Sequence, residues 1–180
     1  MKLIRWSGLV LICTLTVIPM NGLAHAQTNQ TNMSSVHTDI HDTQFEKSGN
    51  VGNHAQFLLD ESFLKSLDKG TVSFNGYQVV SNDDGKSTYN KQVFDQDITV
   101  IDSHSASSVR FSVANPSVSL QQMKDVYDAS KLKHIPHTSN DAQYPDDGTY
   151  VYQGDATRLQ FVVKKGYVST VTVGQVNTEG

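Results

Sequence analysis

The sequence predicts an α+β fold, in which two helix-plus-antiparallel-strand units form one compact domain over residues 49–176. Two observations predict this class. A capped helix pattern followed by strand patterns occurs twice, with helix starts at Glu61 and Ser119. A later strand of each set, at Val109 and Tyr167, keeps the same offset of 58 residues. Such a repeat indicates two units that share one antiparallel layer, with helices on one face, and is consistent with an internal duplication.

The N-terminal segment has the three parts of a secretory signal. A positively charged start is followed by an apolar run from Leu9 to Met20 and by the small-x-small cleavage pattern Ala24-His25-Ala26. The apolar run is too short to span a bilayer. We therefore expect residues 1–26 to be a signal peptide, and a mature chain that begins at Gln27 and has no membrane segment.

Removal of the signal changes the composition. Cys13 lies in the apolar run, so the mature chain has no cysteine and no disulfide. The whole chain has 14 Lys and Arg against 18 Asp and Glu, and cleavage removes Lys2 and Arg5. Twelve cations then face 18 carboxylates, which gives the mature chain a net charge of −6. The exported product is acidic.

Residues 27–48 are polar and lack an apolar period, so they cannot bury enough surface to offset the entropy of ordering them. We expect a disordered tail. His37 and His41 have a spacing that some metal sites use, and His134 and His137 flank a proline. Nothing else in the sequence supports a ligand set, so we predict no metal and no cofactor.

The first unit begins with a helix that Asp60 can cap and Gly70 can end. Asn75-Gly76 is a strong hairpin signal because both residues tolerate positive φ, although a single strand through Gly76 is the alternative. β-branched and aromatic residues predict the strands that follow. The expected elements are a helix over 60–69 and strands over 72–74, 77–79, 92–101 and 109–113.

The second unit begins at Ser119, which forms a capping-box pattern with Gln122 and starts a helix through Asp128. A loop rich in Pro, Asp and His is expected from Lys131 to Gly148. A β-meander with strands over 149–153, 158–163 and 167–173 then ends the domain. Leu159, Phe161 and Val163 alternate with polar residues, so one face of this sheet is wet.

Several segments resemble one known family. They are Gly49–Asp60, Val72–Gly76, Val109–Val113, Ser119–Tyr127, Tyr150–Gln153, Phe161–Val163 and Val171–Gly174. In this order, behind a signal peptide, they resemble the immunodominant staphylococcal antigen B family over residues 49–174. The resemblance implies a secreted or cell-surface protein of Gram-positive cocci that is not enzymatic. It also implies binding of extracellular DNA or RNA without sequence preference.

Such binding draws its free energy mainly from Lys and Arg that neutralise phosphates, and the acidic charge of the mature chain opposes it. The candidate contacts are cations around the meander and two tyrosines that share one strand face, where bases can stack. They are Lys131, Lys133, Arg158, Lys164, Lys165, Tyr150 and Tyr152. The alternatives are a solvated sheet face with lysine-bearing turns, and tyrosines that belong to the core.

No catalytic motif is present: the chain has no Gly-x-Ser-x-Gly elbow, no His-Glu-x-x-His and no phosphate-binding Gly-rich loop. We therefore expect a nonenzymatic binding protein and predict no catalytic residue. The rival to nucleic-acid binding is recognition or inhibition of a host or self protein through the open sheet face. No sorting motif follows Val176, so we expect a secreted protein or one held noncovalently at the cell surface.

Overall fold

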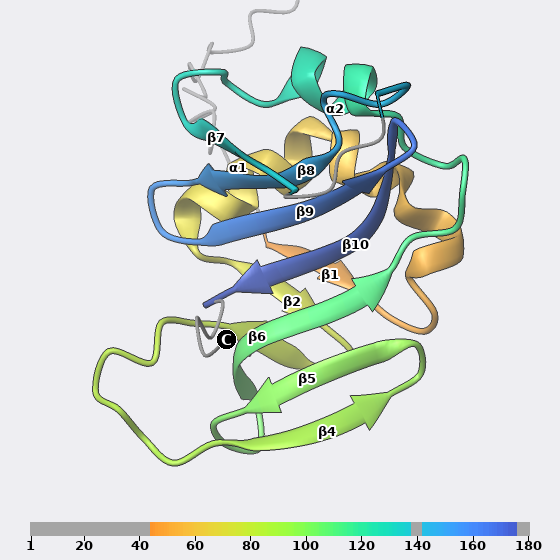
Figure 1. Ribbon diagram of the computed structural model, residues 1–180. Coiled ribbons are helices and arrows are strands. Elements are labelled where there is room, and N and C mark those ends of the chain that lie inside the picture. The colour runs from red at the N-terminus through yellow and green to blue at the C-terminus, as the bar shows by residue number, and fades with distance from the viewer. Residues whose placement is uncertain (1–43, 138–141, 176–180) are drawn as a thin grey trace, which may run out of the picture. The chain divides into compact units, whose positions relative to one another are not determined.

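The computed structural model describes residues 44–137 and 142–175. The expected signal peptide and most of the expected tail lie outside these residues. The described chain forms one curled, mixed β-sheet of ten strands with three short helices (Figure 1). The strands are β1 (Phe45–Lys47), β2 (Val72–Phe74), β3 (Tyr77–Val79), β4 (Tyr89–Val93), β5 (Gln96–Val100), β6 (Ser105–Ser112), β7 (Leu132–Pro136), β8 (Gly148–Gln153), β9 (Arg158–Lys164) and β10 (Tyr167–Gly174). The helices are the 3-10 helix η1 (Gly52–Leu59) and the α-helices α1 (Glu61–Lys69) and α2 (Leu120–Val126).

Strand β6 is the branch point of the sheet. The main strand order is β1-β2-β3-β6-β10-β9-β8-β7, and β5 pairs with β6 and carries β4. Ala106 pairs with Val79 of β3 and with Val100 of β5, while Val109 pairs with both β5 and β10. One edge of β6 therefore holds β3 and then β10, and the other edge holds β5. The β1–β2 and β3–β6 pairs are parallel, and the other pairs are antiparallel.

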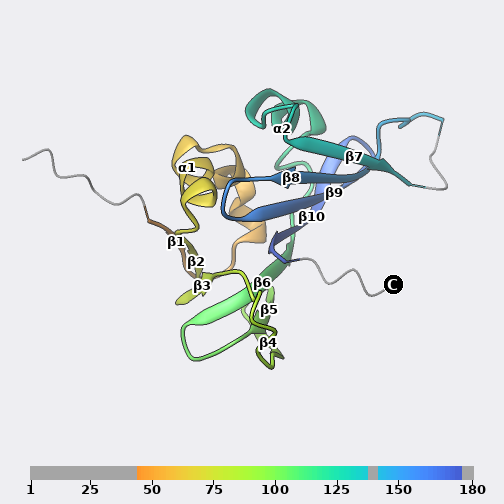
Figure 2. The ribbon, with the colours of Figure 1, turned by 90° about the vertical axis from the view of Figure 1, so that its left-hand side faces the viewer.

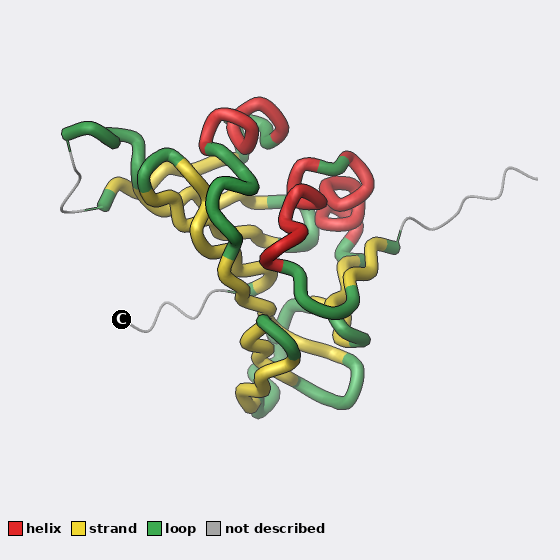
Figure 3. The backbone as a smooth tube through the Cα atoms, turned by 90° about the vertical axis from the view of Figure 1, so that its right-hand side faces the viewer, coloured by secondary structure: helices red, strands yellow, loops and turns green. Residues whose placement is uncertain are grey.

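The helices cover one face of the sheet and close the core there (Figures 2 and 3). Phe57 of η1 is the centre of an aromatic cluster, with ring centroids 5.3 to 6.2 Å from those of four other phenylalanines. These four are Phe45, Phe63, Phe74 and Phe111. Tyr127, just after α2, packs edge-on against Tyr152 and Phe161 and donates a 2.6 Å hydrogen bond to the Leu58 carbonyl. None of the helices in the two described ranges is long and apolar enough to cross a membrane.

The expectation of an α+β fold with two helix-plus-strand units is wrong. The described chain is mostly sheet, and its helices have only 7 to 9 residues. The two halves do not form separate units either, because β10 lies between β6 and β9 and β3 pairs with β6. The equal offset in the sequence arises because each half of the chain has one short helix ahead of its longer strands. It does not reflect a repeated arrangement of strands.

Several local predictions are confirmed. The β2–β3 hairpin turns at Asn75 and Gly76, which have φ of 48° and 81°. Gly70 ends α1 in the left-handed conformation, although the Asp60 side chain makes no capping hydrogen bond. Ser119 and Gln122 form the reciprocal capping box of α2. Strands β8, β9 and β10 form the expected meander.

Three local predictions are wrong. The strand expected over 92–101 is the hairpin of β4 and β5, which turns at Phe94 and Asp95. The loop expected from Lys131 contains β7, which pairs with β8 along its length. The expected tail reaches into β1, because Phe45 packs in the aromatic cluster and the strand pairs with β2. In each case distant partners order a segment whose local sequence is polar or ambiguous.

A polar network fixes the β4–β5 turn to the N-terminal part of the domain. The Asp95 carboxylate accepts hydrogen bonds of 2.8 to 3.0 Å from the backbone N–H groups of Val51 and Gly52. Fully buried Gln96 donates from its amide to Asp95 and to the Gly49 carbonyl, and accepts a 2.6 Å bond from the Asn75 amide. The turn is therefore held in one position from inside the fold.

Candidate binding groove on the open sheet face

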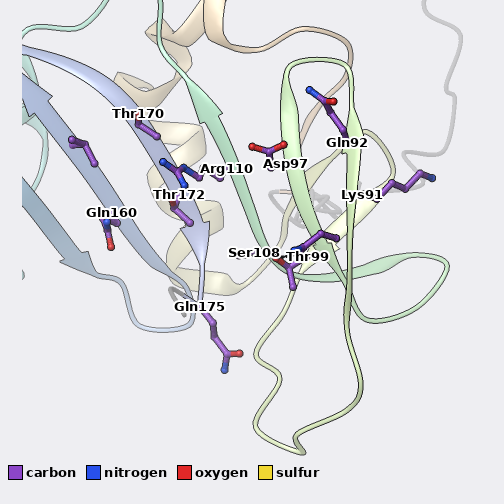
Figure 4. Close-up of a pocket in the computed structure, with 12 residues that line it drawn as sticks. Lys91, Gln92, Asp97, Thr99, Ser108, Arg110, Gln160, Thr170, Thr172 and Gln175 are labelled. Atoms are coloured by element: carbon purple, nitrogen blue, oxygen red, sulfur yellow. Dashed lines mark hydrogen bonds between the residues drawn. The ribbon is translucent and has the colours of Figure 1, made fainter. Parts of the chain in front are cut away.

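The face of the sheet that lies away from the helices forms a polar groove of about 630 Å³ (Figure 4). Strands β4, β5, β6, β9 and β10 supply its walls, because the curl of the sheet brings the β4–β5 hairpin opposite β9 and β10. The side chains are mostly amides and hydroxyls. The lining residues are Asn90, Lys91, Gln92, Asp97, Thr99, Ser108, Arg110, Gln160, Val162, Thr170, Thr172 and Gln175.

The alternation of each strand places most of these residues on one face; Lys91, opposite buried Ile98, is an exception. In β6, Val109 and Phe111 are buried toward the helices, so the flanking Ser108 and Arg110 point to the groove. Strand pairing extends this pattern across the sheet, since Arg110 pairs with Asp97 on β5 and with Thr172 on β10. The groove therefore contains a row of polar side chains that runs across the strands.

Arg110 is the cation at the centre of this row. Its side chain is exposed, and within the described residues its guanidinium has no hydrogen-bond or ion-pair partner. Asp97 lies directly opposite in the strand register without forming an ion pair with it. Nearby Thr99 is hydrogen-bonded to both neighbouring strands: its hydroxyl donates to the Asn90 side-chain oxygen at 3.2 Å and accepts from the Ser108 hydroxyl at 3.1 Å.

Charge is segregated on this face of the sheet. Among the described strands, four cations and two carboxylates point to the open side, as the register and the burial pattern show. The four cations are Arg110, Lys133, Arg158 and Lys164, and the two carboxylates are Asp97 and Glu46. An acidic chain therefore has a sheet face whose formal charge is positive.

The structure does not bring the sequence-predicted cations into one cluster. Lys131 forms a 2.8 Å ion pair with Asp155. Arg158 lies near that end of β9, and its Nε is buried without a partner among the described residues. Lys164 and Lys165 lie at the other end, which is roughly 20 Å away along the strand. There Asp147 accepts hydrogen bonds from the backbone N–H groups of the β9–β10 turn, including that of Lys165. Lys133 lies on β7, opposite Val151.

The two candidate tyrosines belong to the core. Tyr150 and Tyr152 are only 2% and 4% exposed and face the helices. The Tyr150 hydroxyl donates a 2.8 Å bond to the Asp146 carbonyl, and its ring stacks on His134. Burial, with Asp146 and Asp147 nearby, raises the pKa of Tyr150 to about 12. Burial also raises the pKa of Tyr152. Neither ring is accessible as a platform for bases.

The sequence interpretation missed the central groove residues. Arg110, Thr170 and Thr172 each alternate with buried apolar residues, so a polar row on β6 and β10 was readable from the sequence. The sequence did not show that these residues lie next to Asp97, because the pairing of β5 and β10 with β6 is a property of the whole sheet. Among the described residues, no group of three or more His, Cys, Asp or Glu is placed to hold a metal ion.

Fold and groove together define a small, mostly β-sheet protein with a polar, solvent-open sheet face. The chain belongs to the immunodominant staphylococcal antigen B family, whose family model matches residues 44–173. It is 28% identical over 131 residues to immunodominant staphylococcal antigen B of Staphylococcus aureus strains USA300, NCTC 8325 and COL. The alignment covers 71% of this chain and 70% of each relative. No solved structure matches the chain.

Proposed function

We propose that this protein is an exported, nonenzymatic binding protein whose open sheet face takes extracellular nucleic acid without sequence preference. The family relationship supports an antigen-type protein, and the relatives are named as staphylococcal antigens. The groove lining has one carboxylate and neither His nor Cys, which favours binding over acid–base or nucleophilic chemistry.

The observation that carries the proposal is the positive sheet face on an acidic chain. Phosphate contacts by Lys and Arg release counterions, and this release supplies most of the free energy of nonspecific binding. Arg110 is exposed and has no partner in the described residues, so a phosphate can contact it without breaking an ion pair among them. Hydroxyl and amide side chains of the same rows, such as Thr172 and Gln160, are suited to hydrogen bonds with phosphate and sugar oxygens.

The proposal predicts a defined effect of Arg110→Gln. Binding of labelled single-stranded DNA should weaken about equally for unrelated sequences, because a phosphate contact carries no base information. The slope of log affinity against log salt should fall by about 0.7 for one lost contact. A salt series with the purified wild-type and variant proteins measures both quantities.

Lys65→Gln is the matched control. Lys65 is an exposed cation on α1, on the helix side of the sheet, where it pairs with Glu61 at 2.7 Å. The substitution removes the same charge and should leave the salt slope unchanged. Equal losses for both variants would show that net charge rather than the groove governs binding, and would contradict the proposal.

Wild-type protein that binds neither DNA nor RNA at about 20 mM salt, where screening is weak, would favour protein recognition instead. The open face would then be the surface to examine, because two of the three edge strands in the described sheet, β4 and β7, carry residues that discourage pairing with a further strand. Lys91 lies on edge strand β4, and Lys133 and Pro136 lie on edge strand β7. Lysine and proline are typical devices against edge-to-edge pairing.

A further inference from the structure

Phe94 occupies an unfavourable position in the β4–β5 turn. Its φ is 54°, in the left-handed region that glycine and asparagine tolerate and that bulky side chains avoid. Its side chain is also 63% exposed, and it forms no aromatic pair within the described residues. Phe94 therefore contributes neither core packing nor a relaxed turn. Folding alone would favour a different residue here.

The surrounding turn is rigid. Asp95, the next residue, is bonded to the backbone of Val51 and Gly52, and Gln96 is fully buried. These contacts hold the backbone of Phe94 in its strained conformation, because the turn cannot relax without breaking them. An exposed aromatic ring on a fixed backbone loses little conformational entropy when it binds a ligand.

The turn also lies beside the groove. Gln92 and Asp97, which line the groove, lie two residues before and three residues after Phe94. Figure 4 shows both side chains next to the tip of the hairpin. A chain bound along the row of Asp97, Arg110 and Thr172 would leave the groove past this tip.

We propose that Phe94 is a stacking contact for unpaired bases, so that the groove prefers single-stranded over double-stranded nucleic acid. This inference rests on the proposed function. Bases stack on aromatic rings without regard to sequence, and they do so only where they are unpaired. The buried tyrosines of β8 cannot supply this contact, whereas the exposed ring of Phe94 can.

The test is Phe94→Asn, measured for both stability and binding. Asparagine tolerates the left-handed conformation, so the melting temperature should rise by roughly 2 to 6 °C. Affinity for oligothymidylate should fall roughly five- to 150-fold, which corresponds to the loss of one stacked base. Affinity for a duplex and the slope against salt should both stay unchanged, because no phosphate contact is lost. Phe94→Trp should retain single-strand binding.

Tyr89→Ala is the matched control. Tyr89 is an exposed aromatic residue on the same hairpin, 57% accessible, but it pairs with buried Val100 and so faces away from the groove. Its removal should leave oligothymidylate binding unchanged. Phe94→Asn protein that keeps full single-strand affinity, or that melts at a lower temperature, would overturn the stacking role while the groove proposal stands. Wild-type protein without any nucleic-acid binding would overturn both.

Discussion

Replacement of Phe57 by alanine should destabilise the domain by roughly 3 to 5 kcal/mol, the usual cost of deleting a buried phenylalanine ring. Phe57 is 5% exposed and contacts four other phenylalanines from β1, α1, β2 and β6. Its removal leaves a cavity where the helices meet the sheet. For a domain of this size, we expect the melting temperature to fall by roughly 10 to 25 °C, measured by circular dichroism or calorimetry.

Tyr89→Ala provides the comparison for this substitution as well. It deletes an aromatic ring that is mostly in solvent, so stability should change by less than about 0.5 kcal/mol. Phe57→Leu should lie between the wild type and Phe57→Ala, because a branched apolar side chain refills part of the space. A Phe57→Ala protein with the melting temperature of the wild type would mean that the aromatic cluster does not form the core.

The second large effect is expected for Asp95→Ala, at roughly 2 to 4 kcal/mol. The carboxylate serves the N–H groups of Val51 and Gly52, both in buried residues, and water cannot replace it freely there. Gly52 tolerates no addition, since a Cβ would lie 2.0 Å from the Ser112 carbonyl oxygen. The segment therefore cannot move to find other partners. Chemical denaturation of wild-type and variant proteins measures the loss.

Asp97→Ala is the control for Asp95→Ala. It removes a carboxylate two residues away on the same hairpin, which is exposed and unpaired among the described residues. Stability should remain within about 0.5 kcal/mol of the wild type. If both variants lost the same stability, the loss would come from the general charge of the hairpin. The network around Asp95 would then be irrelevant.

The same carboxylate predicts a pH dependence. Partial burial by itself raises the pKa of Asp95, but hydrogen bonds from Gln96, Gly52 and Val51 outweigh it and lower the pKa below its ordinary value. A lowered folded-state pKa gives stability that is complete above about pH 4 and is lost as the pH falls through the folded-state pKa. The difference in stability between wild type and Asp95→Asn should therefore shrink below about pH 4.

Local signals in the sequence were strong where a few neighbouring residues decide the structure. Asn75-Gly76 forms its hairpin and Ser119 forms its capping box because both depend on residues within three positions. Strand β7 and the β4–β5 turn were not predicted, because distant residues decide their structure. Phe94 is a poor turn residue by its own preferences, and the bonds that hold the turn come from residues more than 40 positions away.

The residues of the candidate site show the same difference between local and long-range signals. The sequence identified Lys133, Arg158 and Lys164 as cations near a wet sheet face, and the structure places all three on that face. Whether they bind nucleic acid stays a prediction. Arg110 was missed because its neighbours across the strands belong to segments far away in the chain. Tyr150 and Tyr152 share a strand face, but alternation alone does not say which face the helices cover.

Because of the position of β10 in the sheet, the fold cannot be completed before this strand has been synthesised. Within the sheet, the N-terminal strands meet the C-terminal meander only where β10 pairs with β6, and β10 is the last strand of the described chain. A nascent chain that still lacks residues 167–174 therefore has two sheet fragments with exposed edges. Folding of the whole sheet must wait until synthesis has passed this strand. Such a delay leaves the polypeptide without its complete sheet until the last strand has been made.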